Sequence, residues 1–171
     1  MRNLLIKCLL FIGIYTLFHF GHDVVPLPVF STSESIWQHL KIGFFSAITL
    51  SLLELAYFSL FRHIDNFYNF ALSRLISAQL IVGIIFSLFY LYVGLFYKLP
   101  GSVTEIVLVA FLTFLGAFIA YYIEAEFYWH FSGQDMLLLM VCLLFLVING
   151  YLFIKFSNQV PYYPLFTEHL A

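Results

Sequence analysis

Apolar side chains run almost unbroken through five stretches of the chain, at about residues 4–20, 42–61, 75–97, 103–122 and 136–156. A helix needs roughly 20 apolar residues to cross the hydrocarbon of a bilayer, and these stretches approach or reach that length. Because the apolar residues are continuous rather than alternating, the pattern predicts helices and not barrel strands. We therefore expect an all-α fold, an integral membrane helical bundle of about five transmembrane helices.

The connections between these stretches contain the residues that end helices. "GHDVVPLPVFSTSE", with Pro26 and Pro28, separates the first two stretches, and "KLPGS" lies in the third connection. The tail holds Pro161 and Pro164 and is too interrupted for a sixth span. No internal repeat is visible, so we expect residues 1–171 to form a single multi-pass membrane domain.

Composition agrees with a lipid environment. Of the residues, 63% are hydrophobic and 9% are charged, against roughly 25% charged in soluble domains. The net charge of −2 offers no basic field for nucleic acid, so the lipid bilayer is the expected partner. The two cysteines, Cys8 and Cys142, lie inside apolar stretches, and no C-x-x-C motif supports a thiol–disulfide relay.

The orientation follows from basic residues near the helix ends. No small-x-small cleavage site follows the first stretch, so we expect it to be retained as an anchor. Four basic residues lie on the side of the N-terminus, namely Arg2, Lys7, Arg62 and Arg74. Three lie on the other side, namely Lys41, Lys98 and Lys155. The excess predicts a cytoplasmic N-terminus and an outside C-terminus.

The densest polar block, "STSESIWQHLK", directly precedes the second stretch. Helix initiation explains most of it: Ser31-x-x-Glu34 has the capping-box pattern, and Ser33 or Ser35 are alternative caps. The indole of Trp37 suits the headgroup layer, and the lysine that follows can extend its ammonium group outward. His39 is the residue that this interpretation does not need.

The same block is also a candidate binding site. The residues that we expect to reach the outer interface together are His22, Asp23, Glu34, Trp37, His39 and Lys41. Within this set His22, His39 and Glu34 could bind a divalent metal such as zinc, although the spacing is not a specific zinc signature.

Glu54 lies about midway along the second stretch, where an ionisable group costs roughly 2.5–3.5 kcal/mol. At about 100° per residue it lies some 60° from His39 around the helix, so a path from the outer cluster to Glu54 is one hypothesis. The alternative is a neutral glutamic acid bonded to a neighbouring polar residue such as Ser51, Gln79 or Asn149.

A third polar group, "EAEFYWH", follows the fourth stretch. Glu126 and His130 are spaced for contact on one helix face, with Glu124 and Asp135 close in sequence. We interpret this group as a solvated helix end on the side of the membrane opposite the first block. The chain lacks H-E-x-x-H, G-x-S-x-G, P-loop and G-x-G-x-x-G motifs, so no cofactor is predicted.

The block before the second stretch resembles an uncharacterised family of small prokaryotic multi-pass membrane proteins, a domain of unknown function with an N-E-S-V-W-E-H-L-K block. Residues 33–41 read "SESIWQHLK", which departs from that block at Ser33 and Gln38. The tail at residues 161–166, "PYYPLF", is similar to the P-x-x-P-L-F tail of the family. The resemblance implies the plasma membrane of a bacterium or archaeon and supplies no reaction.

Three functions remain open from the sequence. The first is a non-enzymatic membrane protein that binds or transports a small solute, or serves as a subunit of a membrane complex with another membrane protein or with further copies of itself. The second is a membrane-embedded enzyme with an outer-interface site of Glu34, His39 and His22. The third is a purely structural membrane subunit.

Overall fold

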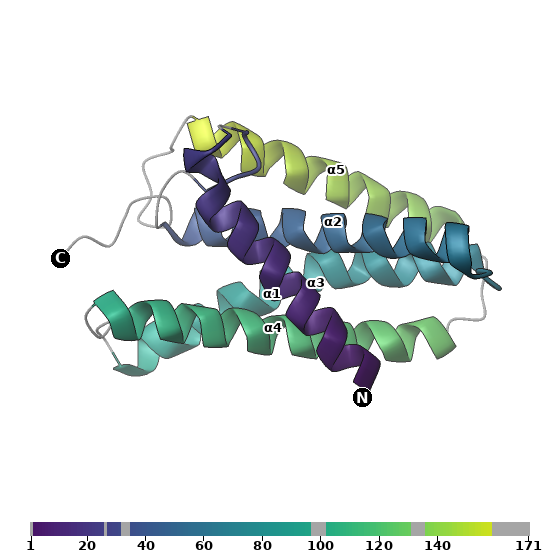
Figure 1. Cartoon of the computed structure of the whole chain (residues 1–171), viewed down its shortest axis with the longest axis horizontal. Helices are drawn as coiled ribbons and strands as arrows, with labels where there is room; N and C mark the ends of the chain where they lie inside the picture. Colours follow the sequence, from purple (N-terminus) through teal and green to yellow (C-terminus); the bar gives the residue numbers. More distant parts are fainter. Residues whose placement is uncertain (1, 26, 32–34, 97–101, 131–135, 159–171) are drawn as a thin grey trace.

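Five α-helices form most of the protein (Figure 1). The computed structural model describes residues 2–25, 27–31, 35–96, 102–130 and 136–158. For residues 2–3, 23, 102–106, 127–130 and 158 it describes the backbone only. The helices are α1 (Arg2–Phe20), α2 (Ile36–Phe61), α3 (Phe67–Phe96), α4 (Ser102–His130) and α5 (Met136–Asn158), with a short 3-10 helix, η1 (Gly21–Asp23), after α1. The described ranges contain no strand, so the predicted all-α bundle is confirmed.

Four helices are long and apolar enough to cross a membrane: α2, α3, residues 107–126 of α4 and residues 136–157 of α5. The apolar stretch of α1, Leu4–Phe20, is shorter. Helices α2 and α3 begin several residues before the predicted apolar stretches, and α4 continues well beyond residue 122. The reason is that hydropathy marks only the part of a helix that suits hydrocarbon, whereas backbone hydrogen bonding continues past it.

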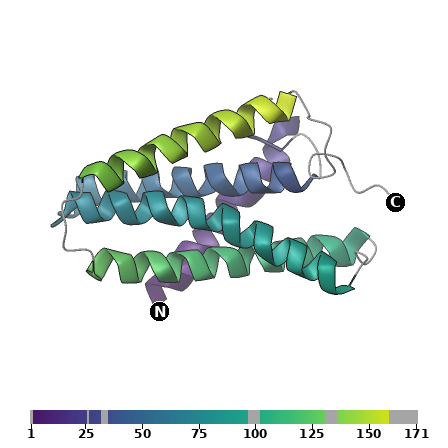
Figure 2. The ribbon, with the colours of Figure 1, turned by 180° about the vertical axis from the view of Figure 1, so that it is seen from behind.

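Helices α1 to α4 pack in a closed cycle. Helix α3 contacts α2 and α4, and α1 contacts the same two helices from the other side. Helix α1 crosses the bundle diagonally, while the other helices run roughly along its long axis (Figure 1). Helix α5 lies outside the cycle against α2 and α3, and the back view shows it apart from α4 (Figure 2).

The close packing of α3 on α4 depends on Gly116. A Cβ atom at this position would lie 2.8 Å from Cγ1 of Ile85 and 3.5 Å from its backbone nitrogen. Small residues allow membrane helices to approach closely, because van der Waals contact replaces the hydrophobic effect as the driving force in lipid. Gly116 therefore fixes how near the two helices lie.

The start of α2 is set by Ser35. Its backbone is extended, and its hydroxyl accepts a hydrogen bond from the backbone nitrogen of Gln38 at 3.4 Å. Ser35 was one of the predicted alternatives, and it caps the helix in place of Ser31.

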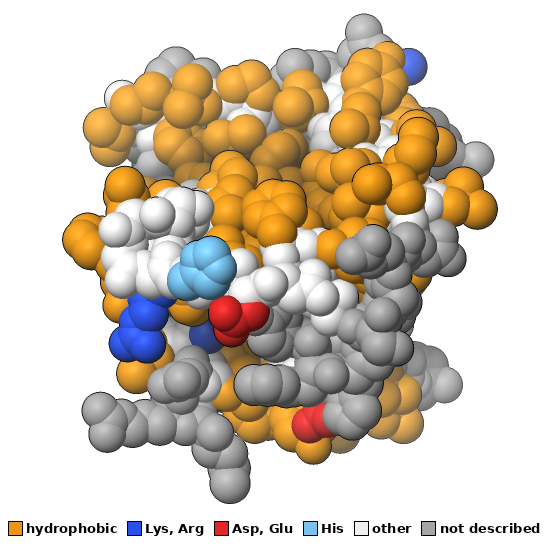
Figure 3. Space-filling model, turned by 90° about the vertical axis from the view of Figure 1, so that its right-hand side faces the viewer, with side chains coloured by type: hydrophobic (Ala, Val, Ile, Leu, Met, Phe, Trp, Pro, Cys, Tyr) orange, Lys and Arg blue, Asp and Glu red, His pale blue; other side chains and the backbone are white. Residues whose placement is uncertain are grey.

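The two ends of the bundle differ in polarity. At one end, which we call the α2–α3 end, Arg62, His63, Asp65 and Asn66 are exposed. Figure 3 looks onto this end and shows basic, acidic and histidine side chains near one another, with apolar side chains above them. At the opposite end, the α1–α2 end, η1 and residues 24–35 connect α1 to α2.

Candidate functional site

Four charged side chains, one from each of the helices α1 to α4, meet in the interior of the bundle. Lys7 comes from α1, Glu54 from α2, Arg74 from α3 and Glu124 from α4. Their side chains are only 12%, 21%, 14% and 6% exposed. Because successive helices run in opposite directions, the last three all lie six or seven residues, about 10 Å, from the helix terminus at the α2–α3 end.

These four charges alternate in sign and close a ring. The ammonium nitrogen of Lys7 lies 2.8 Å from Oε2 of Glu54 and 2.5 Å from Oε1 of Glu124. Nε of Arg74 lies 3.1 Å from Oε2 of Glu54, and its Nη1 lies 3.7 Å from Oε1 of Glu124. Every pair of neighbouring helices in the cycle is thus joined by one opposite-charge contact. We call Lys7, Glu54, Arg74 and Glu124 the charge ring.

The members of the charge ring are not equally enclosed. Glu124 also accepts a hydrogen bond from the hydroxyl of Ser77 at 2.6 Å, and Arg74 donates to the hydroxyl of Ser73 at 3.0 Å. Glu54 receives its two hydrogen bonds, from Lys7 and Arg74, on the single oxygen Oε2. Glu54 is also the most exposed of the four.

The ring is electrically neutral when all four groups are ionised. A charge taken out of water is costly, and a buried pair recovers that cost only with close geometry and further hydrogen bonds. Here each cation contacts both carboxylates, and serines supply additional donors and acceptors. The four charges therefore compensate one another when all are ionised, and any change in the charge of one member leaves a surplus.

An aromatic column leads from the ring along α1. Lys7 lies 4.5 Å from the ring centroid of Tyr121, and Phe11 packs on Tyr121 at 5.9 Å and on Tyr15 at 6.1 Å. The hydroxyl of Tyr15 lies 2.7 Å from Nδ1 of His39. The column thus connects the ring to the α1–α2 end of the bundle through side-chain contacts alone.

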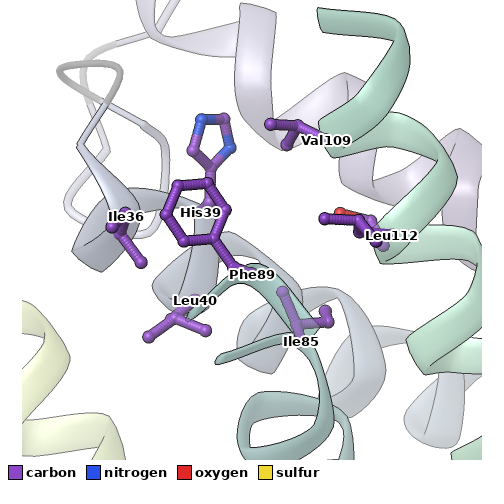
Figure 4. Close-up of a pocket in the computed structure, with 8 residues that line it drawn as sticks. Ile36, His39, Leu40, Ile85, Phe89, Val109 and Leu112 are labelled. Carbon is purple, nitrogen blue, oxygen red and sulfur yellow. The ribbon is translucent and has the colours of Figure 1, made fainter. Parts of the chain in front are cut away.

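The column ends in a cluster of Tyr15, His19 and His39, which we call the histidine cluster. The two imidazoles stack at 5.3 Å, and the ring of Tyr15 stacks on both. Figure 4 shows His39 at the edge of a small hollow with mostly apolar walls. The hollow has a volume of about 10 Å³, roughly the space of one water molecule, and Thr113 also lines it.

Lys41 does not occupy the position expected for it, whereas the placement of Trp37 at the headgroup layer stays a prediction. Lys41 is completely buried and donates hydrogen bonds to the backbone carbonyls of Pro28 and Phe30, so the prediction that it extends outward is wrong. Trp37 packs against Phe153 and Phe156 of α5, at 4.6 and 5.8 Å between ring centroids. Both side chains hold elements together within the bundle.

The predicted metal site is only partly visible. Glu34 lies outside the described residues, as does the side chain of Asp23, while His22 lies half-buried in η1. In the described ranges no three His, Cys, Asp or Glu side chains are grouped closely enough to hold a metal ion. Binding of a metal by His22, His39 and Glu34 therefore stays a prediction.

Glu54 does not lie beneath the histidine cluster. Fifteen residues, about 22 Å of helix, separate it from His39 along α2, and it faces Lys7 and Arg74 instead. The alternative neutral partners are also wrong, because they bond elsewhere. Ser51 donates to the carbonyl of Ala47, and the Asn149 amide donates to that of Gln79.

The prediction of a solvated end at "EAEFYWH" is wrong for Glu124, which is 4% exposed and belongs to the charge ring. Lys7 and Arg74, which we counted among the basic residues on the side of the N-terminus, lie within α1 and α3 and belong to the charge ring, and the side of the membrane on which they lie stays a prediction. Glu54, Arg74 and Glu124 stand at matching distances from the ends of antiparallel helices, but this is visible only once the helix bounds are known. The apolar stretches began too late in α3 and ended too early in α4 for this to be seen.

The fold and the charge ring define a helical membrane protein whose interior carries compensated charges. Comparisons of the chain with protein-family models, with curated proteins and with solved structures each found no match.

Proposed function

We propose that the chain is a multi-pass protein of a prokaryotic plasma membrane that binds and moves a small solute. The charge ring carries this proposal, because ionisable groups at membrane depth are costly and occur preferentially on ion and proton pathways. Arg2 and Arg62, at the α2–α3 end in sequence and structure, favour a cytoplasmic location for that end. The block at residues 33–41 supports the prokaryotic origin through its family resemblance.

The proton is the solute that the ring suits best. A metal cation would require carboxylate oxygens that are not already neutralised, and Lys7 and Arg74 contact both carboxylates. A proton needs no cavity, because it binds directly to a carboxylate oxygen. When a proton binds to Glu54, one negative charge is lost, and Lys7 and Arg74 then share Glu124 as their only carboxylate in the ring. Because α2 no longer contributes an anion, its contacts with α1 and α3 weaken, and a different packing of α2 is favoured.

The remainder of the proposed path follows α1. Tyr121 is 2% exposed and its hydroxyl has no hydrogen-bond partner in the described part of the chain, which makes it available to a transient donor or acceptor beside the ring. Tyr15 and His39 are joined by a hydrogen bond at the other end of the aromatic column. Protonable groups thus stand near both ends of the bundle, with an apolar segment between them.

Proton flux into vesicles tests the proposal. The purified protein is reconstituted with a pH-sensitive dye inside, and a membrane potential is imposed with potassium and valinomycin. We expect flux through the native protein and its loss in Glu54→Gln, since glutamine retains the shape but cannot carry a proton.

Glu126→Gln is the matched control, because Glu126 is an exposed glutamate on α4 outside the ring. It should conduct like the native protein. Equal flux in Glu54→Gln and the native protein would end the proposal, provided that circular dichroism shows the variant to be folded. Absence of flux in both would favour a purely structural ring.

A second candidate is a subunit of a membrane complex, formed with further copies of the chain. A groove of about 430 Å³ on the exposed side of α3 is lined in part by Gln79, Gly83 and Ser87. Hydrogen-bonding and small side chains on a lipid-facing surface are typical of contacts between membrane helices. Gly83→Leu should reduce the oligomer seen by native mass spectrometry from nanodiscs, whereas Gly13→Leu on α1 should not. Both glycines have open space where a Cβ would lie, so neither substitution strains the single chain.

A further inference from the structure

The connection between α1 and α2 exposes apolar side chains. Phe20 is 66% exposed, Val24 83%, Val25 46% and Leu27 47%. We call residues 20–25 and 27–31 the apolar loop. Between α2 and α3, residues 62–66 expose mainly polar and charged side chains (Figure 3), although the flanking Phe61 and Phe67 are 73% and 59% exposed. The two connections therefore differ in the polarity of their own exposed residues.

The backbone of the apolar loop satisfies many of its hydrogen bonds internally. The amides of Val24 and Val25 both donate to the carbonyl of Gly21, and the amide of Ser31 donates to the carbonyl of Phe18 in α1. A loop in water has no need of such partners, because water supplies them. In hydrocarbon each unpaired backbone group is costly, and irregular backbone persists only where protein groups pair with it.

The contacts of Lys41 are the most direct indication that the carbonyls of the apolar loop lie away from water. It is fully buried and donates to two carbonyls of the apolar loop, those of Pro28 at 3.1 Å and Phe30 at 2.5 Å. The contacts of Lys41 in the described chain include no carboxylate. Burying an ammonium group against backbone acceptors is costly, and it is useful where those acceptors have no water to bond.

The position of the apolar loop in the bundle agrees with a hydrocarbon environment. At the α1–α2 end, the ends of α3 and α4 project beyond the apolar loop in both ribbon views (Figures 1 and 2). The apolar stretch of α1 has 17 residues at most and spans about 25 Å, less than the roughly 30 Å of bilayer hydrocarbon. An α1 helix that begins at the opposite interface and crosses the bundle at a slant therefore ends short of the water on the α1–α2 side (Figure 1).

We propose that the apolar loop inserts among the lipid acyl chains of the leaflet at the α1–α2 end. Val24, Val25 and Leu27 contact the hydrocarbon, and Lys41 supplies from inside the hydrogen bonds that water supplies to an ordinary loop. The histidine cluster then lies below a lipid-covered segment. This inference is independent of proton movement, because it concerns the surroundings of a connection and not the charge ring.

Spin-label accessibility in nanodiscs tests the inference. Nitroxide labels are placed at Val24→Cys and, as the matched control, at His63→Cys in the α2–α3 connection, each in a background with Cys8→Ala and Cys142→Ala. Collisions with oxygen, which partitions into lipid, are compared with collisions with nickel-EDDA, which stays in water. We expect the ratio of oxygen to nickel collisions to be several-fold higher at position 24 than at position 63.

Equal ratios at the two positions would overturn the inference, because both connections would then lie in water. Low collision rates with both reagents at position 24 would also overturn it, since a protein partner and not lipid would cover the loop. In Lys41→Met the label at position 24 should gain contact with nickel-EDDA, because the loop carbonyls then need water. An unchanged ratio in a folded Lys41→Met protein would show that Lys41 does not keep water from the loop carbonyls. The comparison of positions 24 and 63 tests the insertion of the loop independently of that variant.

Discussion

Lys7 shows how a single side chain can depend on its neighbours. It lies in an apolar stretch and would be costly there alone, yet it contacts two carboxylates from two other helices. Removing one partner of a buried ion pair typically costs about 3–5 kcal/mol, because the remaining charge is uncompensated. At the level of residues, the stability of the charge ring therefore depends more on its net charge than on the number of its contacts.

We predict that two double substitutions with the same number of removed charges differ in stability. Lys7→Met with Glu124→Gln leaves the neutral pair of Glu54 and Arg74, so it should be more stable than either single variant. Lys7→Met with Arg74→Met leaves two carboxylates without a cation and should be the least stable. The midpoint of unfolding in SDS, followed by circular dichroism, measures the difference. Equal midpoints for the two doubles would show that the ring does not act through net charge.

For Thr113, the direction of the change in the free energy of unfolding is the informative result. It is fully buried beside the hollow at His39, and its hydroxyl has no partner among the described residues. An unpaired buried hydroxyl costs about 1–3 kcal/mol, so Thr113→Val should leave the free energy of unfolding unchanged or raise it. The same unfolding assay applies, with Thr113→Ala as the control that removes volume. A clear loss of stability in Thr113→Val would mean that the hydroxyl is hydrogen-bonded after all.

At the scale of elements, hydropathy predicted the helices well and the charged contacts poorly. Continuous apolar stretches report lipid exposure directly, so all five helices were placed. Hydropathy also treats a charged residue near a span as its boundary, which put Arg74 and Glu124 outside the helices that contain them. Their pairing depends on which helices are neighbours and at what depth, and this information lies in tertiary packing rather than in any local stretch.

The contact between α3 and α4 provides an element-scale prediction. Gly116→Val places new atoms where a Cβ already lies 2.8 Å from Ile85, so the two helices have to separate. Overpacking of this kind costs about 1–3 kcal/mol. Gly13→Val on α1, where the space is open, is the matched control and should be nearly neutral. Unfolding midpoints that fall equally in both variants would point to the loss of glycine itself and not to the α3–α4 contact.

At the scale of the whole molecule, the two ends of the bundle are chemically distinct. The α2–α3 end exposes charged side chains, and the charge ring lies about two turns inside it. The α1–α2 end carries the apolar loop and the histidine cluster. The bundle is therefore chemically asymmetric along its axis, so its two ends would present different groups on the two sides of a membrane.

The ends of the chain should lie on opposite sides of the membrane. We expect this because α1 starts toward the α2–α3 end, the described helices alternate in direction, and α5 finishes at the other end (Figure 1). Fusing the N- and C-termini separately to a reporter active only in the cytoplasm measures it, and we expect activity at the N-terminus alone. Activity at both termini would indicate that one helix, most simply the short α1, does not cross.

The alternating ring also has a consequence for synthesis. The chain delivers the charges of the ring in the order plus, minus, plus, minus, as Lys7, Glu54, Arg74 and Glu124. The first helical hairpin to leave the ribosome therefore contains one ring cation and one ring anion, which lie 2.8 Å apart in the finished protein, and the second hairpin contains a pair 3.7 Å apart. Each hairpin can enter the bilayer with its ring charges already paired, before the other exists. Assembly then exchanges contacts between two pairs, and no intermediate has to hold an unpaired member of the charge ring in lipid.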